Sequence, residues 1–295
     1  MKWHAPAPSK RLIELPDKLT SLPEAPFAAQ NALRRHPLFE PERIKRLLRT
    51  LPRECVEIRA VQRVGNGDEG YKRGALLRDA DPVDTFERLE EKPAWMLLHK
   101  TWAHDGDYNR LLHDYLNSLQ SQCGEAAKGA IATGCWMFLS SGNIVVHFHA
   151  DPDQSFLNQI RGSKNVYVYP ARVVPETAIE EMIYREDQGP IKYNPDYERH
   201  IFKPVRLDPG ASVFLPLYAP HRVTNDSSLS ISWNVGFHTP HSLRRDRVHR
   251  VNWELRQMGM QPAHYNDSVF RDAVKAKLLV PFRIKNRVKR MLSPK

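Results

Sequence analysis

The alternation of apolar and polar residues changes character near residue 130 and again near residue 240. Between these points, short apolar runs with β-branched and aromatic residues recur, and Gly, Pro, Asp and Asn separate them. Many short strands with turn residues between them are typical of a small barrel or sandwich. We therefore predict that residues 130–240 form a mainly β core and that helices flank it.

The first 129 residues read as an N-terminal arm followed by helices and strands that support this core. The first 35 residues are rich in Pro and Ala and predict an irregular arm. Helical patterns follow at residues 40–50, 84–91 (with Asp84 as the cap) and 105–120, and strand-like runs at 55–64 and 94–102. The helix at 105–120 has an apolar side that we assign to the core: Tyr108, Leu111, Leu112, Tyr115, Leu116 and Leu119.

Residues 241–295 form a basic, helical C-terminal segment. Ser242 is a candidate N-cap, and Gly259 lies just past the expected helix end. The apolar positions of this helix are spaced 3, 4 and 3 residues apart: Val248, Val251, Leu255 and Met258. Such a narrow seam suits packing against another helix, either in this chain or in a homodimer.

The net charge of +10 belongs to that segment alone. Residues 241–295 hold fourteen Lys and Arg against four Asp and Glu, whereas residues 1–240 hold thirty of each. A neutral body argues against a nucleic-acid-binding core, and the tail has few aromatic residues to stack on bases. The tail is compatible with a solvated or dimer-forming helix, and also with peripheral contact to an anionic surface such as a membrane.

The cysteines and the N-terminus favour a cytoplasmic protein. Cys55, Cys123 and Cys135 are odd in number, far apart and without a CxxC pair, which predicts reduced, buried thiols. The N-terminus lacks the apolar region of a secretory signal, and no apolar run approaches the roughly 18 residues that span a bilayer.

Candidate metal ligands lie in the stretch "VVHFHADPDQ". On a strand, residues i and i+2 point the same way, so His147, His149 and Asp151 are able to share one face. One reading is a cupin HxH site, but the glutamate that should follow is missing before Gly162. The other is a facial triad of two histidines and one carboxylate, as in non-haem iron oxygenases, with His221 as the third ligand. Strand geometry permits both readings.

Two longer stretches resemble a known family. "HADPDQSFLNQIRGSK" is similar to the HxD…NFLxQIxGxK stretch of the cupin-like JmjC-domain hydroxylases, and "DPGASVFLPLYAPHRVTN" to their later GDxxxIPxxxxHxVxN stretch. This alignment places the family's HxD on His149 and Asp151, not on His147. The interval from Gly210 to His221 keeps the family's eleven-residue step.

The resemblance implies a double-stranded β-helix, or jelly roll, that binds Fe(II), 2-oxoglutarate and O2. The metal ligands would be His149, Asp151 and His221. Lys164 matches the lysine that pairs with the distal carboxylate of 2-oxoglutarate, and Asn234 a late-strand polar residue near the cosubstrate. The implied reaction hydroxylates a protein side chain or a small molecule and releases succinate and CO2; demethylation would be the same step on an N-methyl carbon.

Several positions depart from the family pattern. Val146 stands where relatives have Thr or Ser, His147 where proline is frequent, and Ser155 where Asn is usual. Ser155 or His147 is a candidate to compensate near the cosubstrate. These departures leave a second interpretation open, a catalytically inactive cupin-like binding or regulatory protein. The acidic, aromatic residues 181–202 are expected to border the substrate entrance, with Tyr184, Tyr193 and Tyr197 as pocket lining or as loop anchors.

Overall fold

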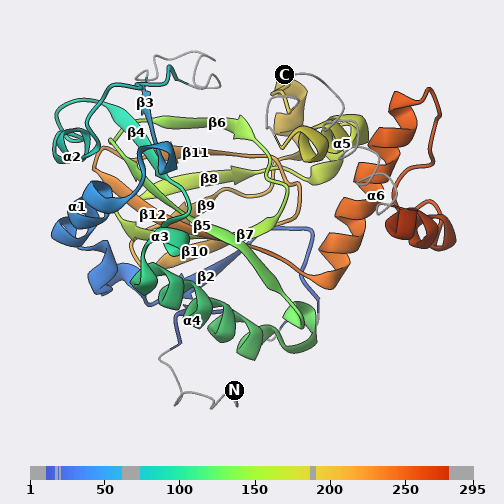
Figure 1. Ribbon diagram of the computed structural model, residues 1–295, viewed down its shortest axis with the longest axis horizontal. Helices are drawn as coiled ribbons and strands as arrows, with labels where there is room; N and C mark the ends of the chain where they lie inside the picture. Colours follow the sequence, from blue (N-terminus) through green and yellow to red (C-terminus); the bar gives the residue numbers. More distant parts are fainter. Residues whose placement is uncertain (1–10, 17–18, 20, 62–73, 187–190, 279–295) are drawn as a thin grey trace.

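Two antiparallel β-sheets face each other and helices cover the outside, in a computed structural model that describes residues 11–16, 19, 21–61, 74–186 and 191–278 (Figure 1). The strands from β5 onward pass back and forth between the two sheets. This topology is a jelly roll, so the predicted fold class is confirmed.

The large sheet has eight described strands in the order β1-β2-β10-β7-β12-β5-β4-β3. Their bounds are Ile13–Glu14 (β1), Phe27–Asn31 (β2), Ala211–Leu215 (β10), Gln154–Arg161 (β7), Ser230–His238 (β12), Ile131–Ser140 (β5), Ala94–Leu98 (β4) and Val56–Ala60 (β3). The small sheet has four, in the order β6-β11-β8-β9. They are Val145–His149 (β6), His221–Asn225 (β11), Lys164–Val168 (β8) and Val205–Leu207 (β9).

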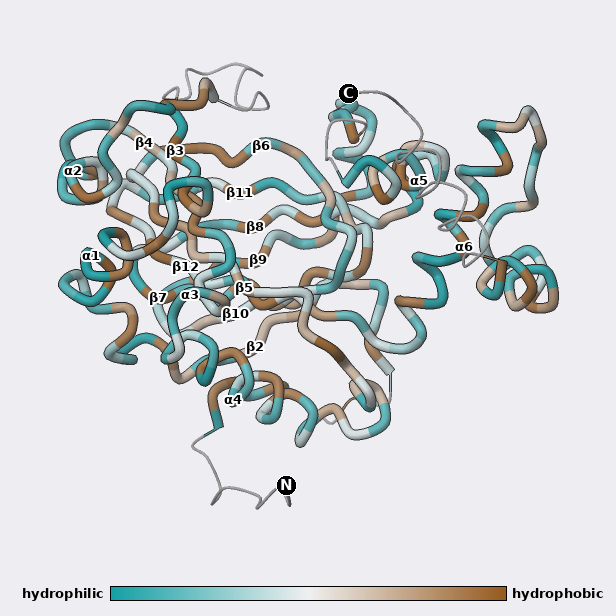
Figure 2. The backbone as a smooth tube through the Cα atoms, in the orientation of Figure 1, coloured by the Kyte–Doolittle hydropathy of each residue, from teal (hydrophilic) through white to brown (hydrophobic). Residues whose placement is uncertain are grey.

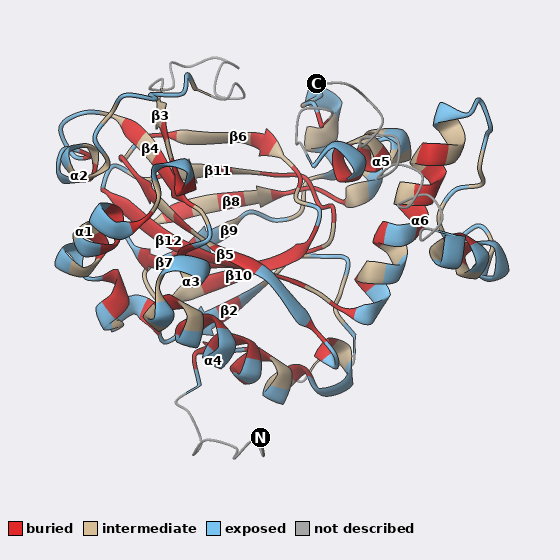
Figure 3. Ribbon diagram, in the orientation of Figure 1, coloured by how far each residue is buried: buried red, intermediate tan, exposed pale blue. Residues whose placement is uncertain are grey.

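Helices cover the outward face of the large sheet and bury the main apolar core there. These helices are α1 (Pro41–Thr50), α2 (Pro82–Glu87), α3 (Thr101–His104) and α4 (Gly106–Cys123). The six apolar residues that the sequence assigns to one side of α4 are all buried (Figure 3). Burying such a stripe against a sheet removes apolar surface from water at roughly 25 cal/mol per Å², which stabilises the fold.

The expected irregular N-terminal arm is wrong for residues 27–31. This segment forms β2 and pairs with β10 along the edge of the large sheet. Phe27 stacks on Phe214 with ring centroids 5.0 Å apart, so aromatic packing adds to the backbone ladder. The ladder satisfies the backbone groups that β10 would otherwise expose at a sheet edge.

Two predicted helix caps are also wrong by three residues. Helix α2 begins at Pro82, and the side chain of Asp81 accepts the backbone N–H of Asp84. The basic helix begins at Pro240 with Thr239 as its cap, while Ser242 is the reciprocal partner three residues on. In both helices, proline occupies the first turn, where its missing N–H is harmless.

Helices α5 (Glu176–Arg185) and α6 (Pro240–Gln257) pack together at one end of the two sheets (Figure 1). Val248 and Val251 of the predicted seam are buried, whereas Met258 at its end is 46% exposed. The three cysteines are unpaired and buried, as predicted. Within the described ranges, no helix combines the length and the apolar character needed to cross a membrane.

Candidate functional site

His149, Asp151 and His221 meet at one end of the small sheet. His149 ends β6 and His221 begins β11, and the two are paired in the strand register. Asp151 follows β6 by two residues, and its Oδ2 lies 3.8 Å from Nε2 of His221. One potential ligand atom from each residue lies within 4.8 Å of the other two. Three potential ligand atoms from two histidines and one aspartate are thus close enough together to hold one metal ion.

Backbone carbonyls fix which nitrogen each histidine presents. Nδ1 of His149 lies 2.7 Å from the carbonyl oxygen of His147, and Nδ1 of His221 lies 3.1 Å from that of Ala219. Because a carbonyl only accepts, each Nδ1 carries the proton and donates. In both residues the unprotonated Nε2 then carries the lone pair that a metal ion would bind.

The protonation of His221 also favours metal binding. Burial, followed by the neighbouring imidazole of His149, lowers the pKa of His221 to about 4, although the charge of Asp151 acts in the opposite direction. The side chain is therefore neutral at pH 7, which is the form that coordinates a metal.

His147 does not join this group, and the HxH reading loses its support. Its backbone carbonyl orients His149, and its ring lies against the ring of His149 with centroids 4.9 Å apart. The side chain of His147 lines the adjoining cavity but is not among the three clustered ligands.

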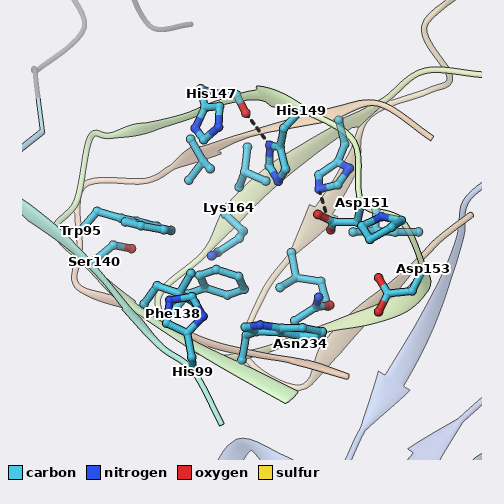
Figure 4. Close-up of a pocket in the computed structure, with 18 of the residues that line it drawn as sticks. Trp95, His99, Phe138, Ser140, His147, His149, Asp151, Asp153, Lys164 and Asn234 are labelled. Atoms are coloured by element: carbon cyan, nitrogen blue, oxygen red, sulfur yellow. Dashed lines mark hydrogen bonds and ion pairs between the residues drawn. The ribbon is translucent and has the colours of Figure 1, made fainter. Parts of the chain in front are cut away.

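A cavity of about 390 Å³ extends from the three ligands into the space between the two sheets (Figure 4). Lys164 points into it, and Trp95, Phe138 and Ser140 line the part farther from Asp151. The cavity falls in the size range of small-molecule sites, which are mostly apolar with a few placed polar groups.

Lys164 is a buried cation beside this cavity. It is 3% exposed, and in the described part of the chain no carboxylate pairs with it. Its Nζ donates to Oγ of Ser232 at 2.6 Å, and that hydroxyl donates to Oε1 of Gln159 at 2.8 Å. Burial lowers the pKa of Lys164 to about 7. A buried ammonium without a counter-ion is costly, and an anionic ligand in the cavity would offset that cost.

Of the other two residues predicted to contact the cosubstrate, the structure places only Asn234 at the cavity. Asn234 lies on β12 beside Leu157 and Trp136 in the strand register and lines the cavity. It is 5% exposed, and its Oδ1 has no hydrogen-bond partner. Ser155 on β7 is fully buried with an unpartnered Oγ, but it does not line the cavity. Asn234 is therefore the better placed of the two to contact a ligand.

Asp153 is a cavity residue that the sequence analysis did not single out. Thr133 donates its hydroxyl to Oδ2 of Asp153, and burial, followed by the charge of Asp151, raises the pKa of Asp153 to about 7. A Cβ on Gly236 would lie 2.3 Å from that Oδ2, so only glycine leaves room for the pair. Asp153 lies in the bend between β6 and β7, so strand alternation does not place it, and its only sequence signal was its position two residues after Asp151.

Strand β4 also contributes unexpected lining residues. Trp95 and Leu97 of β4 line the cavity, and so does His99, which directly follows the strand. No sequence motif marks these residues. They reach the cavity because β4 pairs with β5 in the large sheet.

Among the described residues of 181–202, Met182 and Glu186 border the cavity. Tyr193 and Tyr197 pack against the ring of Phe148 at 5.4 and 5.9 Å, and Tyr184 lies against Trp253 at 5.5 Å. The three tyrosines are therefore loop and helix anchors, and residues 187–190 lie outside the described ranges.

A second group of potential ligands lies between α5 and α6: Glu176, Glu180 and His249. Arg256 donates to Glu180 at 2.8 Å, and Arg245 donates to Nε2 of His249 at 3.3 Å. Glu180 is thus paired with Arg256, and Glu176 contacts the imidazoles of His249 and His264, so we interpret the group as a polar contact that joins the two helices.

Comparisons with known proteins give a weak structural likeness. No family model and no curated protein matches the chain. A solved structure of YcfD from Escherichia coli is 16% identical over 88% of this chain, with a TM-score of 0.47. Another, described as a ribosomal oxygenase in complex with cobalt and 2-oxoglutarate, is 14% identical with a TM-score of 0.46. This chain spans just under two thirds of those chains, at 64% and 63%. At such scores, the site assignment rests on the chain's own side chains.

Proposed function

We propose that this chain is an Fe(II)- and 2-oxoglutarate-dependent dioxygenase that hydroxylates a protein side chain or a small molecule. The observation that carries the proposal is the position of one cavity between a cluster of two histidines and one aspartate and a buried lysine that no carboxylate contacts among the described residues. Such a cavity offers one end for a chelating 2-oxo acid and another for its far carboxylate.

Each residue then has a defined task. Nε2 of His149, Nε2 of His221 and a carboxylate oxygen of Asp151 hold the metal. When bound, Fe(II) supplies the activation of O2 and the oxidative decarboxylation of 2-oxoglutarate to succinate and CO2. Lys164 binds the far carboxylate of 2-oxoglutarate, and Ser232 holds its ammonium group in place.

The remaining wall keeps the site dry. Trp95, Trp136 and Phe138 contribute aromatic surface to the cavity, and Leu157 and Leu215 contribute aliphatic surface. Excluding water strengthens the ionic contact with Lys164 and protects a reactive site from side reactions.

Succinate formation from labelled 2-oxoglutarate, with Fe(II) and O2, tests this function. We expect His149→Ala and Asp151→Ala to lose more than about 100-fold in rate, since even the partners that orient a metal ligand are worth about 10- to 100-fold. The exposed carboxylate of Asp196 provides a matched control, and Asp196→Ala should keep full activity. Full activity in both ligand variants contradicts the assignment.

A catalytically inactive binding protein is the second candidate. It is favoured by the apolar side chain of Val146 in the cavity wall and by the position of Ser155 away from it. Binding of Mn(II) and 2-oxoglutarate by a protein that forms no succinate with Fe(II) in air would support this candidate over the enzyme.

A further inference from the structure

The last described helix, residues 269–278, exposes an apolar stripe to solvent. Phe270 is 77% exposed, and Val274 and Leu278 are each 42% exposed. Residues four apart lie on one face of a helix, so these three form a continuous line. The helix lies at the outer edge of the molecule beside α6, and Figure 3 colours most of it as exposed.

The inner side of this helix is polar, which reverses the usual pattern. Asp272 is 4% exposed and accepts the backbone N–H of Asn266 at 2.8 Å. Lys275 is 8% exposed and donates to the carbonyl of Ala263 at 2.7 Å. A surface helix normally buries its apolar side and exposes its charges. Here hydrogen bonds of charged groups hold the helix down while its apolar side faces outward.

Cations surround the stripe. Arg271 and Lys277 are exposed on the same helix, and Arg244 of α6 donates to the carbonyl of Val269 at 3.2 Å. Figure 2 shows hydrophilic and hydrophobic residues interspersed along the backbone of this helix. The sequence that follows, residues 279–295, adds six Lys and Arg and no Asp or Glu. Any partner of this surface must accept apolar side chains and positive charge together.

We propose that this face docks on an anionic lipid bilayer, with Phe270, Val274 and Leu278 in the interfacial region and Arg271 and Lys277 on the headgroups. A helix with apolar residues on one side and flanking cations binds such a surface by apolar burial plus attraction to anionic lipids. A second copy of the chain would bring like charges together. A nucleic acid would use the cations but leave the apolar stripe in water.

Co-sedimentation of the full chain with vesicles tests this proposal. We expect binding to vesicles rich in phosphatidylglycerol, weak binding to pure phosphatidylcholine, and a loss of binding at high salt as charges are screened. Phe270→Ser combined with Val274→Ser should weaken binding at least about tenfold, because two apolar side chains no longer enter the interface. Arg271→Gln combined with Lys277→Gln should weaken it roughly 30-fold, since each cation near the surface contributes about fivefold.

Matched controls lie outside the stripe. Arg46→Gln with Arg49→Gln removes the same charge from the exposed side of α1, and Ile131→Ser removes an exposed apolar residue from β5. Both should bind vesicles like the wild type. Equal binding to the two lipids, or a stripe variant that binds like its control, overturns the proposal. So does a dimer that dissociates on Phe270→Ser, or RNA binding that the charge variant abolishes.

Discussion

The two faces of the large sheet are built from the same strands but carry opposite chemistry. On β5, Cys135, Met137 and Leu139 are fully buried against the helices, whereas Trp136 and Phe138 line the cavity. On β12, the outward residues Trp233, Val235 and Phe237 are likewise fully buried and apolar.

The inward positions of β12 include Ser232 and Asn234, which are buried although they are polar. A buried acceptor such as Oδ1 of Asn234 without a partner lowers stability by about 1–3 kcal/mol. The comparison teaches that the outward face is built for apolar packing, while the inward face keeps buried polar groups next to the cavity, one of which, Oδ1 of Asn234, has no hydrogen-bond partner among the described residues.

The largest effect should come from the outward face. Met137→Ala removes a fully buried side chain and should lower the free energy of unfolding by about 2–5 kcal/mol, because a cavity remains. The affinity for 2-oxoglutarate should stay unchanged at a temperature where the variant is folded. Chemical denaturation and calorimetry measure the two quantities. If the affinity for 2-oxoglutarate fell together with the free energy of unfolding, packing on the outward face and ligand binding on the inward face would not be independent.

Lys164→Met should act in the opposite direction on the inward face. It replaces a buried cation by an apolar chain of similar length and should raise the free energy of unfolding of the ligand-free protein by roughly 1–4 kcal/mol. It should also weaken 2-oxoglutarate binding at least about 30-fold, since truncating one partner of a buried charge pair costs about 2 kcal/mol or more.

Lys203→Met, at an exposed lysine, is the control and should change neither quantity. If the Lys164→Met protein were less stable than the wild type and bound 2-oxoglutarate with unchanged affinity, Lys164 would stabilise the fold and have no part in ligand binding.

The pH dependence of binding should sharpen the same point. The pKa of Lys164 is about 7 in the ligand-free site, below its ordinary 10.5, because the side chain is buried. Above pH 7, binding of a carboxylate must first protonate the amine, so affinity should fall about tenfold per pH unit and stay level below pH 7. Stability of the ligand-free fold should instead rise from pH 7 to 10.5, as the unfolded chain alone keeps the proton.

Titration calorimetry in two buffers of different ionisation heat measures proton uptake on binding at pH 8. Lys164→Arg removes the titration and should flatten the profile. A wild-type affinity that does not change between pH 7 and 9 would conflict with this role.

The smallest effect should come from Asn234→Ala. It removes an unpartnered buried acceptor, so stability should change by less than about 1 kcal/mol. The affinity for 2-oxoglutarate in the presence of Mn(II) should fall several-fold, in line with one lost hydrogen bond of about 1 kcal/mol. Ser155→Ala, with a similar buried and unpartnered oxygen outside the cavity, should leave affinity unchanged.

Local alternation predicts a mainly β core and the α4 core stripe, whereas the jelly roll and the residues of the ligand cluster were implied by the resemblance of two motifs to a known family. His149 and His221 lie 72 positions apart, yet each belongs to a motif that can be recognised on its own. Alternation alone left His147 and His149 equivalent. The family resemblance favoured His149 over His147, and the grouping of His149 with Asp151 and His221 in the structure agrees with that choice.

The parts that the sequence missed depend on contacts between distant segments. β2 is a strand because β10 offers it an edge, and Trp95 lines the cavity because β4 pairs with β5. The pairing of Asp153 with Thr133 requires the absence of a side chain at Gly236, which no local pattern reveals. The outward stripe of residues 269–278 was equally hidden, since periodicity does not tell which face of a helix is covered.

Titration of 2-oxoglutarate into the protein with and without Mn(II) tests the central claim most directly. In the proposed function, the cluster of His149, Asp151 and His221 and the ammonium of Lys164 hold opposite ends of one ligand, so binding should require Mn(II). Asp151→Ala and Lys164→Met should each weaken it. Equal affinity with and without the metal, or wild-type affinity in Asp151→Ala, would contradict the account.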